Sequence, residues 1–582
     1  MKATISLSKL GIKSIKRGCR ALNYEEAFAA VTGPGQLFEI TEGNILGHHM
    51  KYFAHTPPSL GDLFGRCRDF GDKEAVVYGT ERISYSTLMD QADRIAHLLS
   101  VDLGVQKGDR VAIAMRNLPE WISTYIAVHL IGGVATLINA WWQPNEIAYS
   151  LDDSTPKVIV CDKDRATRSI DAARERGVKL VVVRDFDREI DGEGVIHLDP
   201  NDTSLPTNYT RPAMDHEDDA TILYTSGTTG FPKGAVSSQR GVLTAIFANG
   251  ARAAIAMLRN PEANTPRFPT AFILAIPLFH VTGSVAVMLS ALVSGAKIVL
   301  MHRWDPNEAA RIIEEERITR FVGVPTMSID LLENEEFLKR DTSSLTHIGG
   351  GGSAVPPELI RKIASTPGKG APGFGYGMTE TNSYGPQIEG EEALARPTSA
   401  GKPLPILEVA IFNEFGERQE PNVRGEICFS GPNVIKGYWN NEAATKAAFF
   451  GSFLRSGDIG YIDEDGYTYV EDRIKDMVIR GGENVYCAEV EAAIYECDGV
   501  HEAAVFGLPD PRLGEEVAAV VYKIAGSDLT AESLEAQLTA KIAKFKVPSK
   551  IFIVDEQLPR GATGKILKRD LKEFYSKATN TN

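Results

Sequence analysis

The first half of the chain alternates between two spacings of apolar residues. Between Tyr85 and Leu99 they recur every three or four residues, which predicts a helix with Ser84 or Ser86 as its N-cap. Pro119 opens a second predicted helix, which runs to Ile131 and ends at Gly132. Short β-rich runs separate the helical stretches, at residues 110–115, 134–139, 158–161 and 180–183. Because strands alternate with helices of this length, residues 58–200 are predicted to form parallel βαβ units.

The second half continues this pattern and then changes it. Strands are predicted at residues 220–224, 271–276, 320–324 and 347–352, with a helix at 241–258. From Glu408 onward short strands with intervening turns indicate a small β-rich subdomain. A domain boundary is predicted near Asp472 to Asp476, and the residues after it show a compact α+β pattern of the size of a small domain.

Composition excludes several classes of protein. With 43% hydrophobic and 24% charged residues, the 582-residue chain has the composition of a soluble globular protein. A net charge of −15 argues against a nucleic-acid-binding protein, because binding phosphates needs a basic face. Six scattered cysteines without a Cys-x-x-Cys pair suit a reducing compartment and give no zinc pattern. We see no apolar run long enough to span a bilayer and expect a cytoplasmic location.

The first twenty-four residues are basic, and the first acidic residue is Glu25. They lack the continuous apolar core of a secretory signal. Three interpretations stay open: a disordered tail, a helix lying on an anionic membrane surface, and an organelle transit peptide. We favour a tail or a weak peripheral membrane contact.

One stretch combines small hydroxyl residues, glycines and a lysine directly after a predicted strand. Its candidate ligands are Thr225, Ser226, Gly227, Thr228, Thr229, Gly230 and Lys233. Glycine-rich turns expose backbone N–H groups that bind anions, and the lysine adds a charge suited to phosphate. The stretch is not a Walker A motif, because Phe231 and Pro232 separate Gly230 from Lys233. We interpret it as a loop that wraps a polyphosphate; the alternative is a flexible surface turn.

Three further motifs carry groups suited to a nucleotide. In Gly375-Tyr376-Gly377-Met378-Thr379-Glu380 the tyrosine offers a stacking face, the threonine a donor to phosphate and the glutamate an oxygen ligand for Mg²⁺. Asp458 can accept hydrogen bonds from ribose hydroxyls, although alone it is more typical of a turn residue. Lys565 lies on a Gly- and Thr-containing turn near the C-terminus and matters only if that turn reaches the phosphates.

Taken together and in this order, the motifs resemble those of the AMP-forming acyl-CoA synthetases of the adenylate-forming superfamily. The resemblance extends from about Pro58 to the end and also includes residues 277–283, 349–353, 473–476 and 480–489. It implies an α/β fold: a large N-terminal domain of two α/β subdomains plus a β subdomain, and a small mobile α+β C-terminal domain. The implied division is an N-terminal extension at 1–57, an AMP-binding domain at 58–474 and a C-terminal domain at 475–582, hinged at Lys475.

The resemblance also assigns roles to residues. It implies catalytic roles for Lys565, Thr379, Glu380 and His280, with Glu380 as the Mg²⁺ ligand. Beyond the phosphate loop, the implied ATP/AMP-binding residues are Gly351, Gly352, Ser353, Gly375, Tyr376, Gly377, Thr379, Asp458 and Arg473. The implied acyl pocket contains His280, Val281, Ser284, Gly349 and Gly350, and the implied coenzyme A residues are Gly481, Gly482 and Glu483.

The implied reaction activates a carboxylic acid with ATP and Mg²⁺ to an acyl-adenylate, which then reacts with coenzyme A. Ser284 stands where some long-chain relatives have a bulky aromatic gate, which together with Gly349–Gly352 suggests an open tunnel and a medium- or long-chain fatty acid. A bulky aryl or terpenoid acid, another acceptor such as a carrier-protein thiol or oxygen, and a non-catalytic adenylate-binding protein are the alternatives. The intact Lys233, Glu380, Asp458 and Lys565 argue against the last.

Two points of the sequence stand apart. Cys487 occupies a position that is usually proline in the family, and we interpret it as structural rather than nucleophilic. The oligomeric state stays open, a homodimer included.

Overall fold

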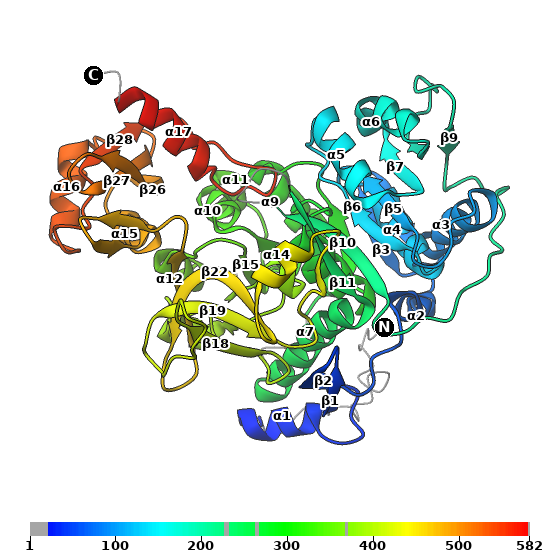
Figure 1. Cartoon of the computed structure of the whole chain (residues 1–582), viewed down its shortest axis with the longest axis horizontal. Coiled ribbons are helices and arrows are strands. Elements are labelled where there is room, and N and C mark those ends of the chain that lie inside the picture. Colours follow the sequence, from blue (N-terminus) through cyan, green and yellow to red (C-terminus); the bar gives the residue numbers. More distant parts are fainter. Residues whose placement is uncertain (1–20, 226–231, 262–266, 367–369, 580–582) are drawn as a thin grey trace.

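The structure is a computed structural model that describes residues 21–225, 232–261, 267–366 and 370–579. It confirms the α/β class, with two large sheets and a smaller one in the N-terminal part of the chain and a separate five-stranded sheet in the C-terminal part (Figure 1).

The first large sheet contains most of the predicted βαβ units. Its eight strands run in the order β20-β11-β10-β6-β5-β7-β8-β9, and neighbours from β10 through β6 to β9 are parallel. The strands are β5 (Arg110–Ala114), β6 (Val134–Leu137), β7 (Val158–Asp162), β8 (Lys179–Val183), β9 (Val195–Leu198), β10 (Asp219–Thr225), β11 (Lys233–Ser238) and β20 (Gly437–Tyr438). Helix α3 (Tyr85–His97) precedes β5, and α4 (Pro119–Leu130), α5 (Pro144–Ser154) and α6 (Lys163–Glu175) follow β5, β6 and β7.

The predicted helix boundaries in this sheet are confirmed. Ser84, and not Ser86, caps α3 by accepting from the Thr87 N–H. Pro119 is the first residue of α4, where its missing N–H removes no helical bond.

The second large sheet also has eight strands, in the order β17-β16-β15-β14-β12-β13-β3-β4. They are β3 (Glu74–Tyr78), β4 (Glu81–Ser84), β12 (Ala271–Leu274), β13 (Lys297–Leu300), β14 (Arg320–Gly323), β15 (His347–Gly351), β16 (Ala371–Gly375) and β17 (Gln387–Glu389). Its helices include α7 (Gln239–Arg259), η4 (Thr282–Leu289), α8 (Ser290–Val293), α9 (Pro306–Glu315), α10 (Pro325–Glu333), α11 (Glu335–Lys339), α12 (Pro357–Ser365) and α13 (Gly390–Ala395). Strands β3 and β4 precede the whole first sheet in sequence, so this pairing joins the two halves of the domain.

The predicted β-rich subdomain after Glu408 is a five-stranded antiparallel sheet. It contains β18 (Glu408–Phe412), β19 (Gly425–Ser430), β21 (Phe449–Phe450), β22 (Phe453–Ile462) and β23 (Thr468–Arg473), with α14 (Glu442–Ala447) between β20 and β21. The C-terminal part follows with β24 (Val478–Arg480), β25 (Glu483–Val485), α15 (Cys487–Tyr495), β26 (Val500–Asp510), β27 (Gly514–Lys523), α16 (Ala531–Thr539), β28 (Lys550–Val554) and α17 (Lys568–Thr579). Its buried residues form a core of their own.

Residues 21–57 pack onto the N-terminal domain. Helix α1 (Tyr24–Thr32) and the hairpin of β1 (Ile40–Ile45) and β2 (His48–Phe53) lie against α7. The rings of Phe38 and Phe53 lie 5.7 and 5.8 Å from that of Phe247 on α7. The basic residues before them, for which a tail or a lipid contact is expected, lie outside the described residues.

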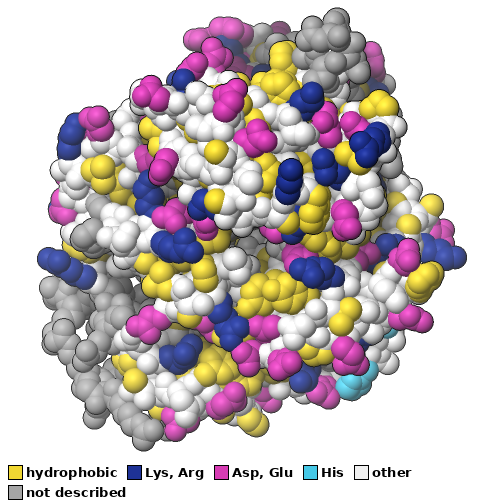
Figure 2. Space-filling model, turned by 90° about the vertical axis from the view of Figure 1, so that its left-hand side faces the viewer, with side chains coloured by type: hydrophobic (Ala, Val, Ile, Leu, Met, Phe, Trp, Pro, Cys, Tyr) yellow, Lys and Arg dark blue, Asp and Glu magenta, His cyan; other side chains and the backbone are white. Residues whose placement is uncertain are grey.

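Helix α7 is, within the described residues, the one helix long and apolar enough to cross a membrane by length and composition. Over its most apolar window 61% of the residues are buried inside the protein, as in the core helix of a globular domain. On the face drawn in Figure 2, Lys and Arg side chains are interspersed with Asp and Glu, and no single sign of charge dominates it.

Candidate active site

Two adjacent strands hold the ends of the predicted phosphate loop together. Thr225 ends β10 and Lys233 begins β11; they pair in antiparallel register, and the Thr225 hydroxyl donates to the Lys233 carbonyl at 3.4 Å. The Lys233 ammonium lies 4.4 Å from the centre of the Tyr438 ring. The other loop candidates, Ser226, Gly227, Thr228, Thr229 and Gly230, lie outside the described residues. The described ends of the loop thus present a cation, held over an aromatic ring, that is suited to phosphate.

Glu380 places a buried carboxylate beside this lysine. It lies in the short helix η5 (Thr379–Thr381), which Thr379 begins, and is 6% exposed. The Tyr438 hydroxyl donates to its Oε1 at 2.8 Å. Burial raises the pKa of Glu380 although Tyr438 and Lys233 act in the opposite direction. The carboxylate is therefore undercompensated by positive charge.

This environment fits a magnesium ion. Proteins commonly hold Mg²⁺ with one or two carboxylates and the phosphates of a nucleotide. The described residues contain no cluster of three or more His, Cys, Asp or Glu side chains that could hold a metal without a ligand. Glu380 would therefore bind Mg²⁺ together with ATP, and the ion would neutralise charge on the phosphates.

Asp458 is held by a hydrogen bond from Tyr376 and an ion pair with Arg473, which lies on the strand next to its own. The Tyr376 hydroxyl donates to Asp458 Oδ2 at 2.6 Å, and Arg473 Nε lies 3.3 Å from Oδ1. Asp458 and Arg473 face each other across β22 and β23. Burial raises the pKa of Asp458, and Arg473 partly offsets this. A buried carboxylate oriented by two donors is suited to accept ribose hydroxyls.

The predicted adenine-side residues lie together at the carboxyl ends of two parallel strands. Gly351 ends β15 opposite Gly375, which ends β16, and Tyr376 and Gly377 follow directly. Ser353 lies two residues beyond β15 and is exposed. Ligands commonly bind at this edge of parallel sheets.

Lys565 reaches this site from the C-terminal domain. A Cβ placed on Gly352, which has φ +89°, would lie 3.3 Å from Lys565 Cε and 3.5 Å from Nζ. Burial lowers the pKa of Lys565 to about 8; nearby Arg473 also lowers it, and Asp458 opposes them. The turn that carries Lys565 therefore reaches the candidate site, with the lysine ammonium near Arg473 and Asp458.

His280 lies close enough to Lys565 for the lysine charge to act on its imidazole. Burial and the Lys565 charge lower the pKa of His280 to about 3, so the imidazole is neutral. The Thr282 N–H donates to its Nδ1 at 3.2 Å, which leaves the proton on Nε2. A neutral donor at this position can bind an acid oxygen without adding charge.

The remaining acyl-pocket candidates divide into two groups. Val281 and Ser284 are buried beside His280, and the Ser284 hydroxyl donates to the His280 carbonyl at 3.1 Å. Gly349 and Gly350 lie within the sheet: a Cβ there would lie 1.8 and 1.7 Å from carbonyl oxygens of the adjacent strands. The lack of a side chain at these two positions is therefore needed for close packing of the strands, and their place in an acyl tunnel stays a prediction.

The residues predicted to contact coenzyme A are not among those that meet at the candidate nucleotide site. Gly481 and Gly482, with φ +62° and +90°, form the turn of the β24–β25 hairpin, and a Cβ on Gly482 would meet no atom within 4 Å. Glu483 is exposed, and Lys475 lies in an exposed turn between β23 and β24. Of the two predicted C-terminal groups, the structure brings Lys565, and not the glycine hairpin, to the site.

Cys487 has a backbone role beside the hinge. Its N–H donates to the buried carboxylate of Asp472, and its thiol donates to the Asp476 carbonyl at 3.1 Å. Burial raises the pKa of Asp472 to about 6, although Lys568 opposes the shift. Burial also raises the pKa of the Cys487 thiol well above its usual value, which agrees with a structural interpretation. A proline at this position would lack the N–H that Asp472 uses.

Several residues of the site carry no sequence signal. Tyr438, which contacts both Lys233 and Glu380, lies in the two-residue strand β20, and only the pairing of β20 with β11 brings it there.

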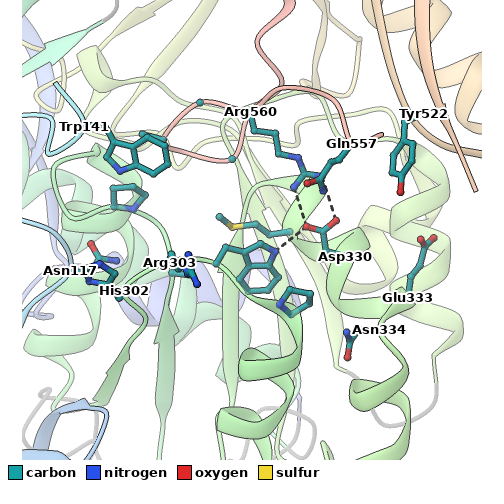
Figure 3. A pocket seen from close by; sticks show the side chains of 18 of the residues that line it. Asn117, Trp141, His302, Arg303, Asp330, Glu333, Asn334, Tyr522, Gln557 and Arg560 are labelled. Carbon is teal, nitrogen blue, oxygen red and sulfur yellow. Dashed lines mark hydrogen bonds and ion pairs between the residues drawn. The ribbon is translucent and has the colours of Figure 1, made fainter. Parts of the chain in front are cut away.

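A cleft of about 790 Å³ lies between the two domains (Figure 3). Trp141, Arg303 and Asp330 line it from the N-terminal domain, and Tyr522, Gln557 and Arg560 from the C-terminal domain.

Comparison with known proteins decides the family. Residues 63–439 match the model of the AMP-binding enzyme family and residues 489–565 that of the AMP-binding enzyme C-terminal domain. This chain belongs to the AMP-binding enzyme family. It is an AMP-forming acid–thiol ligase that uses ATP, Mg²⁺ and coenzyme A.

Individual relatives are similar along most of the chain. A long-chain-fatty-acid–CoA ligase of Bacillus subtilis (strain 168) is 33% identical over 529 residues, covering 87% of this chain and 92% of the relative. A feruloyl-CoA synthase of Amycolatopsis sp is also 33% identical, over 86% of this chain and 96% of its own length. The structure of ATP-bound MatB from Rhodopseudomonas palustris superposes with a TM-score of 0.76 at 30% identity, covering 89% of this chain and 99% of that one.

Proposed function

We propose that this ligase activates a medium- or long-chain fatty acid and transfers it to coenzyme A. The observation that carries the proposal is the state of Ser284. Its side chain is small and buried, and its hydroxyl is engaged with the His280 carbonyl, so it presents neither bulk nor a free polar group. A small side chain without a free polar group at this position suits an alkyl chain that passes beside His280.

Similarity to known ligases supports the same choice. A long-chain-fatty-acid–CoA ligase is 33% identical to this chain. The equally similar feruloyl-CoA synthase keeps a bulky aryl acid as the alternative.

A panel of acids tests the proposal. Pyrophosphate release is measured with and without coenzyme A for acetate, propionate, saturated acids of increasing length, and ferulate. We expect AMP as product and the highest kcat/KM for a medium- or long-chain acid with coenzyme A present. A highest kcat/KM for acetate, propionate or ferulate would overturn the proposal.

Variants of Ser284 connect the panel to the structure. Ser284→Phe should shift the preferred acid to a shorter chain, because an added aromatic ring fills the path beside His280. Ser284→Ala, which keeps the small volume, is the matched control and should keep the chain-length preference.

A further inference from the structure

Asp330 lies at the domain interface and belongs to none of the nucleotide-site motifs. Asp330 lies on α10, and its carboxylate accepts two hydrogen bonds from Arg560 of the C-terminal domain, at 3.0 Å from Nη1 and 3.4 Å from Nη2 (Figure 3). The Asp330 and Arg560 side chains are only 10% and 14% exposed. A two-pronged contact between an arginine and a carboxylate fixes orientation as well as distance.

Asp330 is itself held in place by an aromatic side chain. The Trp304 indole N–H donates to Asp330 Oδ2 at 2.9 Å, and its ring packs against Phe321 with 5.5 Å between centres. The indole has one N–H, and it is used here. Trp304 therefore orients the carboxylate that receives Arg560.

Arg560 and Lys565 belong to one short, closed turn. The Gly561 N–H donates to the Lys565 carbonyl and the Leu567 N–H to the Pro559 carbonyl, at 2.9 and 2.8 Å. Arg560 also contacts Glu502 within the C-terminal domain. Because the turn is tied across its base, fixing Arg560 also fixes the position of Lys565.

Helix α10 also contacts the other end of this turn, at Gly564. The Thr326 hydroxyl donates to the Gly564 carbonyl at 3.1 Å, and a Cβ on Gly564 would lie 3.2 Å from Met327 Cε. Thr326 and Asp330 are four residues apart on α10 and so lie on one face of the helix. One face of α10 therefore contacts the turn at both Arg560 and Gly564, and Gly564 directly precedes Lys565 in the chain.

We propose that Asp330, oriented by Trp304, is a positioning residue that docks Arg560 and thereby places the Lys565 ammonium for acid adenylation. A rotation of the C-terminal domain about the predicted hinge would separate Arg560 from Asp330 and leave its contact with Glu502, which lies in the same domain. The contact therefore favours one arrangement of the domains. The inference concerns placement of Lys565 and does not depend on which acid is the substrate.

The test measures the two half-reactions separately, using the acid that gives the fastest ATP–pyrophosphate exchange. Asp330→Asn should slow the exchange by roughly 10- to 100-fold through kcat, with little change in KM for ATP, because the ATP-binding groups stay in place. It should keep the rate at which supplied acyl-adenylate and coenzyme A form the thioester. Trp304→Phe keeps the ring but removes the N–H, and should give a smaller loss in the same half-reaction.

Two controls separate positioning from general stability. Glu336→Gln removes a partly exposed acid of the neighbouring helix α11, which pairs with Arg340, and should change neither half-reaction. Asp330→Asn added to Lys565→Ala should cause no further loss of exchange, because the first residue acts through the second. Equal losses in both half-reactions, or additive losses in the double variant, would show the inference to be wrong.

Discussion

At the scale of single residues, the family resemblance predicts a role in adenylation for Lys565, and the proton on its side chain sets the charge that it can supply. Its ammonium lies among His280, Arg473 and Asp458, and burial with Arg473 lowers its pKa to about 8. A cation aimed at the reacting carboxylate and α-phosphate lowers the barrier between two anions. Below pH 8 the group is mostly charged, and above pH 8 this charge is lost.

This gives a pH dependence with a defined sign. We expect kcat/KM for ATP in the exchange reaction to fall as the pH rises through about 8, since this parameter reports the free enzyme. Lys565→Arg should remove the fall, because arginine stays charged, and Lys565→Ala should lower exchange by roughly 10² or more at all pH values. Thioester formation from supplied acyl-adenylate is the control; a fall in exchange that persists in Lys565→Arg would assign the titration to another group.

At the scale of elements, the start of α15 joins the C-terminal domain to the strand before the hinge. The Cys487 N–H donates to Asp472 on β23, whose carboxylate is 8% exposed. Lys568 of α17, which pairs with Glu491 at 2.6 Å, adds positive charge nearby. Loss of a hydrogen-bond donor to a buried carboxylate lowers the free energy of unfolding by about 1–3 kcal/mol.

Cys487→Pro should therefore destabilise this chain, although proline is usual there in the family. We expect a lower midpoint of thermal unfolding, measured by calorimetry, because the substitution removes the donor to Asp472. Cys487→Ser keeps the N–H and should unfold close to the parent protein. If both variants lose the same stability, the thiol and not the backbone donor is the important group.

At the scale of the whole molecule, the two groups of the C-terminal domain that have predicted roles lie in different places. Lys565 lies in the nucleotide site, while Gly482 faces open space on the β24–β25 hairpin. The resemblance that predicts a hinge at Lys475 predicts that rotation of the domain exchanges them. The position of Lys475 in an exposed turn is compatible with such a motion.

Variants of the predicted hinge and of the glycine hairpin test this predicted rotation of the C-terminal domain. Lys475→Pro should restrict the hinge and slow thioester formation more than adenylation, because the structure already has Lys565 in place. Gly482→Leu should also impair thioester formation selectively, by crowding the thiol path. Gly466→Leu, at an open hairpin turn with φ +83° in the N-terminal domain, carries the same backbone strain and should affect neither half-reaction; comparable losses in all three variants would rule out the two-arrangement account.

Sequence by itself determined the local features and their order. The spacing of apolar residues predicted the strands and helices of the βαβ units, because burial of one face is a local property of the pattern. The motif order predicted the family, which the family models confirm, since these motifs depend on short runs of residues. The roles that the family implies for Lys233, Glu380, Asp458 and Lys565 stay predictions.

Tertiary structure alone decided which distant residues meet. Strands β3 and β4 join the second sheet across more than half of the domain, and β20 brings Tyr438 to Lys233 and Glu380. Gly349 and Gly350 allow close packing of the strands next to theirs, and Asp330 contacts Arg560 across a domain boundary. None of these contacts leaves a local pattern, because each depends on packing between segments far apart in the chain.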